Sequence, residues 1–358
     1  MTLLARDEAD VVDAHLAFHL NAGVDFVVAT DNRSEDGTTE ILERYEKEGL
    51  LHLIREPGDD MRQAEWVTRM ARFAATELGA NWIINSDADE FWWPQGGSLK
   101  DVLATVPSRY GVVRGCWRHF LARPGGPEEF AERMTVRLCV PASPGDKETI
   151  YHVHQKVAHR ATRDVEIEGG NHNADGRGLE PLRVWHPIEV LHFSLRTANQ
   201  VRQKGQGGWL RNQAYEPPAH QIRLNAAVTS GDFAGFFESH AVDDAALERR
   251  LADGTLAIDT RLRDALRLLR SPDGTFRVPA PDLPSPLAFP MPAIVDRAVY
   301  AGEGSILDEI DGVVRAERRV AALEHRLDAL QQAPPGDLGA RLRARAGRLT
   351  HRRRLAPR

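Results

Sequence analysis

The stretch NWIINSDADEFWW, Asn81 to Trp93, places two aspartates directly after a short apolar run. The β-prone residues Trp82–Ile84 predict a buried central strand. If the extended conformation continues, Asp87 and Asp89 point to the same side, roughly 7 Å apart at the backbone. Two converging carboxylates repel one another unless a cation or a set of hydrogen-bond donors lies between them, and oxygen ligands suit Mg²⁺ or Mn²⁺. The alternative is a strand-end turn whose aspartates face water.

The residues before this stretch alternate between strand-like and helix-like sequence. The predicted strands are Thr2–Arg6, Asp25–Thr30 and Leu50–Glu56, and the predicted helices are Glu8–Gly23, Thr38–Gly49 and Ala64–Ala80. This order predicts an α/β fold with a mainly parallel sheet and helices on both faces. Ligands of such sheets bind outside the carboxyl ends of the strands. Asp31 follows the second strand, so we expect it in one crevice with Asp87 and Asp89.

The pattern is less regular from Tyr110 to about Phe193, where we predict the acceptor half of the same domain. Its predicted strands are Tyr110–Trp117, Met134–Val140, His152–Ala161 and Arg183–Ser194. Helical spacing returns between Asp243 and Arg270, and seven prolines between Ser271 and Pro292 predict an extended linker or a surface wrap.

Apolar residues between Ile306 and Leu330 predict a short helical hairpin or weak coiled coil, through which we expect weak self-association. We therefore expect four parts: an α/β domain (1–235), a helical and proline-rich extension (236–300), a C-terminal helix (301–332) and a basic disordered tail (333–358).

The formal net charge of −6 hides an asymmetry along the 358 residues. Leu338 to Arg358 holds eight arginines and no acidic residue, so the rest carries about −14. An acidic body argues against a nucleic-acid partner, whereas the tail favours peripheral contact with an anionic membrane. Only Cys116 and Cys139 are present, and neither a secretory signal nor an apolar run of roughly 18 residues is visible. We expect a cytoplasmic protein, peripheral at the inner face of the membrane.

Four motifs occur in order: RDEADVVDAHLAFHLNAGVDFVVATDNRSEDGTTEIL, WIINSDADEF, GGNH and LHFSLRTANQVRQKG. Over about Leu4 to Gly208 the chain resembles bacterial family-2-like glycosyltransferases of the GT-A fold, with the Asp-x-Asp-Glu-Phe type of metal motif. Asp7 stands where that family usually has asparagine. The resemblance implies a GT-A-like sheet followed by a helical C-terminal extension. It also implies metal-dependent, inverting transfer from a nucleotide sugar to a glycan, lipid-linked or small-molecule acceptor, in cell-surface polysaccharide biosynthesis.

The resemblance also implies site residues. The donor would contact Asp31, Asp87, Arg196 and Lys204, and Mn²⁺ or Mg²⁺ would be held by Asp87, Asp89 and His192, with His172 as the alternative to His192. The metal would stabilise the charge on the departing diphosphate. Each residue also has a structural interpretation: an Asx-turn for Asp31, a hydrogen-bonded core residue for His192, and helix-surface charges for Arg196 and Lys204.

An inverting reaction needs a general base, an aspartate or glutamate on the acceptor side. Five glutamates qualify, and spacing does not separate them: Glu128, Glu129, Glu166, Glu168 and Glu180. Sugar-stacking platforms are expected among Trp92, Trp93, Trp117 and Trp209, which are equally plausible core aromatics. His15 and His19 have a zinc-compatible spacing but lack the glutamate of a metalloprotease motif, so we expect structural roles.

Two other classes compete with the glycosyltransferase. A nucleotidyltransferase on the same sheet usually needs a glycine-rich phosphate loop after the first strand, and ARDEAD, Ala5–Asp10, has no glycine. A non-enzymatic scaffold would use the C-terminal helix and the arginine tail to assemble partners. The presence of Asp31, Asp87 and Asp89 together favours the enzyme over the scaffold.

Overall fold

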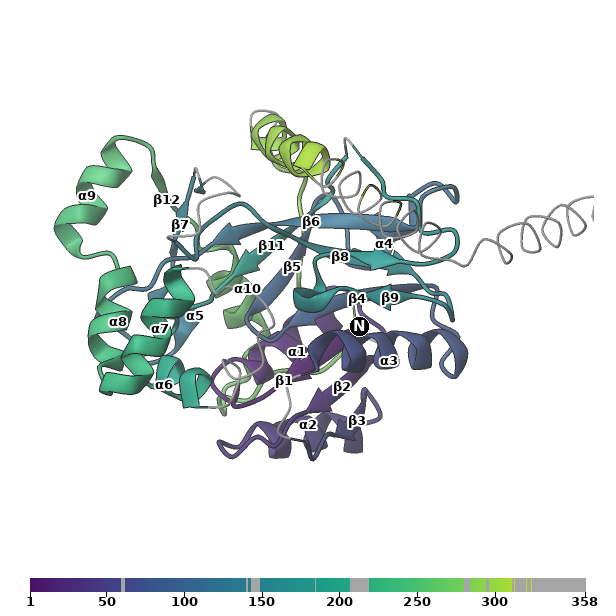
Figure 1. Ribbon diagram of the computed structural model, residues 1–358, viewed down its shortest axis with the longest axis horizontal. Helices are drawn as coiled ribbons and strands as arrows, with labels where there is room; N and C mark the ends of the chain where they lie inside the picture. The colour runs from purple at the N-terminus through teal and green to yellow at the C-terminus, as the bar shows by residue number, and fades with distance from the viewer. Residues whose placement is uncertain are drawn as a thin grey trace, which may run out of the picture. The chain divides into compact units, whose positions relative to one another are not determined.

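The computed structural model describes residues 1–58, 62–139, 141–142, 149–183, 185–206, 219–279, 284–293 and 296–310, together with residues 312, 320 and 323. Residues 1–305 form one compact unit, shown with its elements in Figure 1, and residues 306–358 form a second. The predicted basic tail lies outside the described residues, as does most of the helical segment predicted up to Leu330. The boundaries of the four predicted parts stay predictions.

One large sheet organises the first unit. Its eight strands lie in the order β3 (Leu51–Arg55), β2 (Val27–Asp31), β1 (Thr2–Ala5), β4 (Trp82–Asp87), β8 (Gln155–Arg160), β6 (Val112–His119), β11 (Ile188–His192) and β5 (Glu90–Pro94). Since β8 is antiparallel to both β4 and β6, those two strands run in the same direction. Six of the eight strands share that direction, and β8 and β5 oppose it. The predicted α/β class with a mainly parallel sheet is confirmed.

Helices cover both faces of this sheet. Along β2, Val27 and Ala29 join the hydrophobic cluster that contains residues of α1 (Val12–Asn21), α2 (Thr38–Lys47), α4 (Leu99–Ala104) and α10 (Arg261–Leu269). Val28 joins a second cluster, built with Met70 of α3 (Gln63–Thr76). Because successive strand residues point to opposite faces, the two clusters lie on opposite sides of the sheet.

The chain does not stay extended beyond Asp87. A turn at Ala88 and Asp89 leads into β5, which pairs antiparallel with β11 at the edge of the sheet. The expectation that Asp87 and Asp89 share one side of a continuing strand is therefore wrong. The turn lets Phe91, Trp92 and Trp93 pair with β11, where all three are buried. The burial of these large apolar side chains is the physical reason for the turn.

A helical segment follows the sheet, and its part after residue 235 is the predicted helical C-terminal extension. Its elements are α6 (Ala198–Gln206), α7 (Ala219–Ser230), α8 (Phe233–His240), α9 (Asp244–Ala252), β12 (Leu256–Ile258) and α10. The strand β12 was not predicted, and it pairs with β7 (Val136–Leu138), which ties the extension to the first half of the unit. The smaller elements are α5 (Phe130–Arg133), β9 (Glu166–Ile167), a 3₁₀ turn (Gly169–Asn171) and β10 (Ala174–Asp175). Residues 296–310 are helical.

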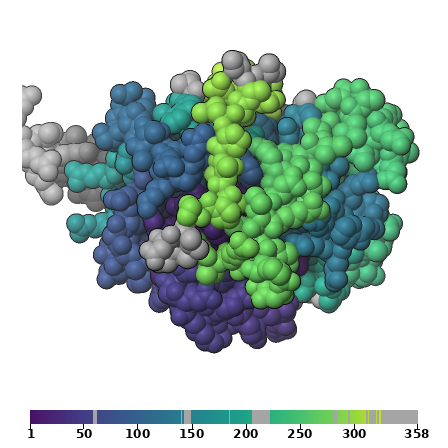
Figure 2. Space-filling model, turned by 180° about the vertical axis from the view of Figure 1, so that it is seen from behind, coloured from purple at the N-terminus to yellow at the C-terminus, as the bar shows by residue number. Residues whose placement is uncertain are grey.

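The described part of the proline-rich segment packs on the core as a wrap. Phe289 contacts the rings of Phe18 and Trp93, with centroids 6.0 and 5.0 Å away. The side chain of Asn21 donates to the carbonyl of Arg277. From behind, green residues of this part of the chain lie beside the purple N-terminal elements (Figure 2). Across the described residues, no helix has the length and apolar character needed to cross a membrane.

Candidate active site

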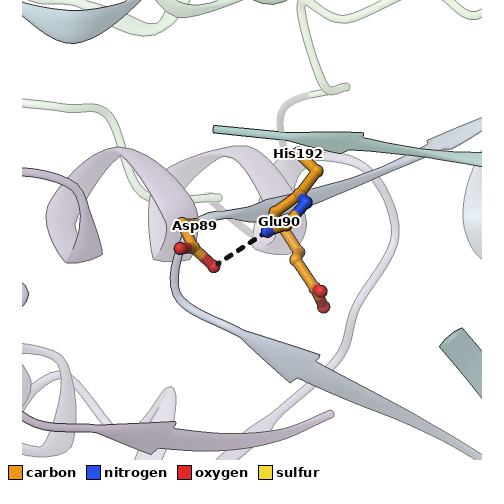
Figure 3. Close-up of side chains that lie close together, drawn as sticks. All are labelled: Asp89, Glu90 and His192. Atoms are coloured by element: carbon orange, nitrogen blue, oxygen red, sulfur yellow. Dashed lines mark ion pairs between the residues drawn. The ribbon is translucent and has the colours of Figure 1, made fainter. Parts of the chain in front are cut away.

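The carboxyl ends of β1, β4, β6 and β11 lie at one edge of the sheet, because these strands share a direction. His192, the last residue of β11, stands opposite Glu90 of β5 and His119 of β6. The turn after β4 adds Asp89, and Figure 3 shows Asp89, Glu90 and His192 close together. One ligand atom from each of these three buried side chains lies within 4.8 Å of the other two. Below we call them the Asp89 group.

Asp89 lies beside two cationic side chains and the ring of His192. Its Oδ2 lies 2.9 Å from Nζ of Lys204 and 3.6 Å from Nη1 of Arg196, and its Oδ1 lies 3.9 Å from Nε2 of His192. Burial opposes the charge, but Lys204, followed by His192 and Arg196, holds the pKa of Asp89 well below its usual range. Asp89 is therefore ionised, and the side chains of Lys204 and Arg196 beside it are suited to contact an anion.

Asp87 is separated from the Asp89 group by a buried lysine. Nζ of Lys156 lies 2.5 Å from Oδ2 of Asp87 and 2.9 Å from Oε1 of Glu90. Oδ1 of Asp87 accepts hydrogen bonds from the amides of Gln63 and Asn171. Both oxygens of Asp87 are thus engaged, and the structure brings Glu90 rather than Asp87 to Asp89 and His192.

Glu90 has three hydrogen-bond donors around a fully buried carboxyl group. Besides Lys156, it accepts from Nε1 of Trp117 at 2.9 Å and from the backbone N–H of Asp87 at 3.2 Å. Burial raises the pKa of Glu90 to about 8, against the opposing effect of Lys156. These contacts hold Glu90 in place directly after the turn.

The loop after β1 closes the site from the other side. Arg196, which is 0% exposed, pairs with Glu8 and lies 2.7 Å from Asp10, while Nζ of Lys204 lies 3.2 Å from Oε1 of Glu8. Burial raises the pKa of Glu8, with Lys204 and Arg196 opposing it. Arg196 and Lys204, both predicted, therefore connect the loop after β1 to Asp89.

Sequence reasoning missed Glu8, Asp10, Lys156 and Asn171. Glu8 and Asp10 directly follow the first predicted strand, so the rule that ligands bind at carboxyl ends would have found them. Lys156 could have been recognised because it lies inside a predicted strand, and a lysine is almost never fully buried unless it is paired.

Asp31 lies at the carboxyl end of β2, but its contacts here are local. Its Oδ1 accepts from the hydroxyl of Ser34 at 2.6 Å and its Oδ2 from the hydroxyl of Thr39 at 2.6 Å. These contacts stabilise the turn that leads into α2. The predicted donor-binding role of Asp31 stays a prediction.

His172 lies near the site without joining the Asp89 group. Its Nδ1 bonds to the carbonyl of Gln155 at 2.7 Å, and its ring stacks on His154 at 3.6 Å. His192 instead stacks on Trp117, with centroids 4.2 Å apart. Of the two histidines proposed as ligands, the structure brings His192 to Asp89.

The five glutamates proposed as general base are not part of the Asp89 group. Glu129 pairs with Arg270 at 2.5 Å, and Glu166 is 79% exposed beside Arg72. Glu180 adjoins Val112 at the amino end of β6, roughly 20 Å from His119 by the rise of a strand. Arg133 bonds to the carbonyl of Glu128, and Glu168 is exposed near the 3₁₀ turn. The structure singles out none of them.

The four tryptophans differ in their surroundings. Trp92 and Trp93 are buried in the core cluster, which favours their structural interpretation. Trp117 lies at the site, between His192 and the ammonium of Lys156, 5.4 Å from its ring centroid. Trp209 lies outside the described residues.

His19 has a structural role, since its Nε2 accepts from the backbone of Trp92.

A family model for glycosyltransferase family 92 matches residues 5–120, about a third of the chain. The matched segment includes Glu8, Asp31, Asp87, Asp89 and Glu90. This match shows that the chain is a glycosyltransferase, which confirms the predicted enzyme class. This family model describes family 92, so it does not support the finer resemblance to family-2-like enzymes.

Among solved structures, the chain is similar to S. aureus TarS 1-349 in complex with UDP, at 13% identity and a TM-score of 0.32, covering 65% of this chain and 71% of that one. The same protein in complex with UDP-GlcNAc gives 13% identity and a TM-score of 0.32, over 65% and 72% of the two chains. Similarity at this level assigns no residue or ligand to this chain. No curated protein sequence matches it.

Proposed function

We propose that this glycosyltransferase takes its sugar from a nucleotide-sugar donor bound at the Asp89 group, and transfers it with inversion to a glycan, lipid-linked or small-molecule acceptor. The observation that carries the proposal is the buried contact of Asp89 with Lys204 and Arg196 at the carboxyl edge of the sheet. A departing nucleoside diphosphate gains negative charge, which preorganised cations stabilise.

The residues of the Asp89 group fit a divalent metal ion. Two carboxylates and an imidazole are suitable ligands for Mn²⁺, and Mg²⁺ also prefers carboxylate oxygen. One ligand atom from each of the three residues lies within 4.8 Å of the other two, and Nε2 of His192 lies 3.9 Å from Oδ1 of Asp89. Five carboxyl groups (Glu8, Asp10, Asp87, Asp89 and Glu90) meet three cationic side chains (Lys156, Arg196 and Lys204), and a bound divalent cation would favour the ionised form of Glu90, whose pKa burial raises.

We therefore propose Asp89, Glu90 and His192 as the residues that hold Mn²⁺ or Mg²⁺. When bound, the metal supplies Lewis-acid stabilisation of the diphosphate. Asp87 is not one of the three residues whose ligand atoms lie within 4.8 Å of one another, so we propose that it positions the site and faces the donor.

The cationic side chains of Lys204 and Arg196 have different roles in this proposal. Lys204 is 32% exposed, so its ammonium can reach a donor phosphate while it stays beside Asp89. Arg196 has no exposed side chain, so it positions Glu8, Asp10 and Asp89. Asp31 completes the proposed donor contacts, at the end of β2.

Further parts of the proposal rest on the sequence. They are membership of the family-2-like group, cytoplasmic location, a role in cell-surface polysaccharide biosynthesis, contact of the arginine-rich tail with an anionic membrane, and weak self-association through the C-terminal helix. The tail prediction is checked by co-sedimentation with anionic vesicles at low and high salt, with and without Leu338–Arg358.

A donor panel tests the proposed function. The purified protein is mixed with UDP-, GDP- and dTDP-sugars, and release of nucleoside diphosphate is followed with Mn²⁺ and with EDTA. Metal-dependent release from one nucleotide class is expected, with water as the acceptor when no other is present. If no donor binds and none is hydrolysed, the non-enzymatic scaffold is the better account.

A further inference from the structure

A cavity of about 550 Å³ lies outside the Asp89 group. Its polar lining comes from Thr149, Tyr151, Arg223, Ser239, His240 and Arg250, on the segment before β8 and on helices α7, α8 and α9. Its volume falls in the range of small-molecule sites. In Figure 1 the labels of these three helices lie together at one end of the large sheet.

Two contacts place this cavity next to the candidate active site. The ring of Tyr151 lies 5.6 Å from that of His119, which lies 5.4 Å from that of His192. Leu121, another lining residue, comes two residues after the end of β6. The cavity therefore adjoins the Asp89 group on the side of β6 and β11, away from Asp31 at the end of β2.

The described lining residues include two cationic side chains. Arg223 of α7 and Arg250 of α9 both face the cavity, and none of its described lining residues is acidic. Nε of Arg250 donates to the hydroxyl of Thr255, and no ion pair of Arg250 occurs among the described residues. Guanidinium groups hold carboxylates and phosphates through paired hydrogen bonds, and the hydroxyls of Thr149, Tyr151 and Ser239 suit the rest of a sugar.

We propose that this cavity is the acceptor subsite and that its acceptor carries an acidic group, a carboxylate or a phosphate, bound by Arg223 and Arg250. The proposal rests on the proposed function, since an acceptor subsite requires the donor to bind at the Asp89 group. It narrows the acceptor to an acidic glycan or glycoside.

Matched pairs of small probes test the proposal by calorimetric titration of the full chain. The carboxylate arm compares 4-nitrophenyl β-glucuronide with 4-nitrophenyl β-glucoside, and the phosphate arm compares glucose 6-phosphate with glucose. We expect at least tenfold tighter binding of the acidic member in one arm. That preference should fall about tenfold in Arg250→Gln and in Arg223→Gln, and less in Arg250→Lys.

The neighbouring residue Arg249 is the matched control, because it is exposed on the same helix and does not line the cavity. Arg249→Gln should keep the preference for the acidic probe. Equal binding of acidic and neutral probes in both arms, or equal loss in Arg249→Gln and Arg250→Gln, would overturn the proposal.

A second titration separates this proposal from the proposed function. UDP with Mn²⁺ should bind equally well to wild type, Arg223→Gln and Arg250→Gln, which also shows that the variants are folded. If UDP, GDP and dTDP all fail to bind while the acidic probe still binds through the arginines, the donor site is wrong and the cavity is not an acceptor subsite. If a diphosphate binds and no acidic probe does, the inference about the cavity alone is overturned.

Discussion

The ammonium of Lys156 lies 2.5 Å from Oδ2 of Asp87, within the region where the sequence predicted a divalent metal ion. The same nitrogen lies 2.9 Å from Glu90, and Lys156 is 1% exposed. The ammonium of Lys156 therefore links Asp87 at the end of β4 to Glu90 at the start of β5. Removing one partner of such a buried pair leaves the other charge uncompensated.

We therefore predict that Lys156→Met lowers the free energy of unfolding by about 3–5 kcal/mol, the usual cost of breaking a buried ion pair. Urea denaturation measures this loss. The double variant Lys156→Met with Asp87→Asn should recover part of it, because the carboxylate that lies 2.5 Å from the ammonium is removed as well. Unchanged stability in Lys156→Met would show that the pair is not formed in solution.

His192 and His172 give a matched pair of variants. His192→Ala should weaken Mn²⁺ binding by about 10- to 100-fold and lower turnover, because it removes a nitrogen ligand beside Asp89. His172→Ala should leave metal affinity nearly unchanged, since His172 is bonded to Gln155 instead. Metal titration of both variants decides between them, and the reverse result would exchange their roles.

Lys204 is expected to act on the donor rather than on the fold, because its side chain is 32% exposed beside Asp89. Lys204→Ala should weaken binding of a nucleoside diphosphate about tenfold, the order expected from a lost charge-assisted hydrogen bond. Arg202→Ala on the same helix is the control, since Arg202 is exposed and bonds to Asn199. Equal losses in the two variants would mean that Lys204 acts only through the general charge of α6.

Buried neutral histidines make stability depend on pH. Burial lowers the pKa of His159 to about 4 from an ordinary value of about 6.5. Between these values the unfolded chain binds a proton that the folded chain does not, so this contribution is complete above pH 6.5 and is lost as the pH falls. His159→Gln should therefore reduce the loss of stability between pH 6.5 and 5 by about 1.5 kcal/mol.

The exposed His52 is the control for that measurement, with 44% of its side chain accessible. Denaturant midpoints for wild type, His159→Gln and His52→Gln are compared at pH 6.5 and pH 5. If His159→Gln and wild type show the same pH dependence, His159 is not buried as a neutral ring.

The predictable part of the site follows from local sequence. The alternation of strands and helices placed Asp31, Asp87 and Asp89 at one edge because parallel strands share their carboxyl ends. The contact between Lys156 and Asp87 spans 69 residues and depends on β8, an antiparallel strand inserted between β4 and β6. No local pattern specifies which partner such a strand takes. The three-residue strand β12 was missed because it is too short for alternation to register.

The central claim is that Asp89 holds a metal ion to which the diphosphate of a nucleotide-sugar donor binds. Its most direct test is calorimetric titration of the nucleoside diphosphate from the donor panel, with and without Mn²⁺, into wild type and Asp89→Asn. Asp25→Asn serves as control, since Asp25 is exposed and pairs with Lys100. We predict that Mn²⁺ strengthens binding to wild type and to Asp25→Asn, and that Asp89→Asn loses the metal-dependent part. The same Mn²⁺-dependent affinity in Asp89→Asn would contradict the account.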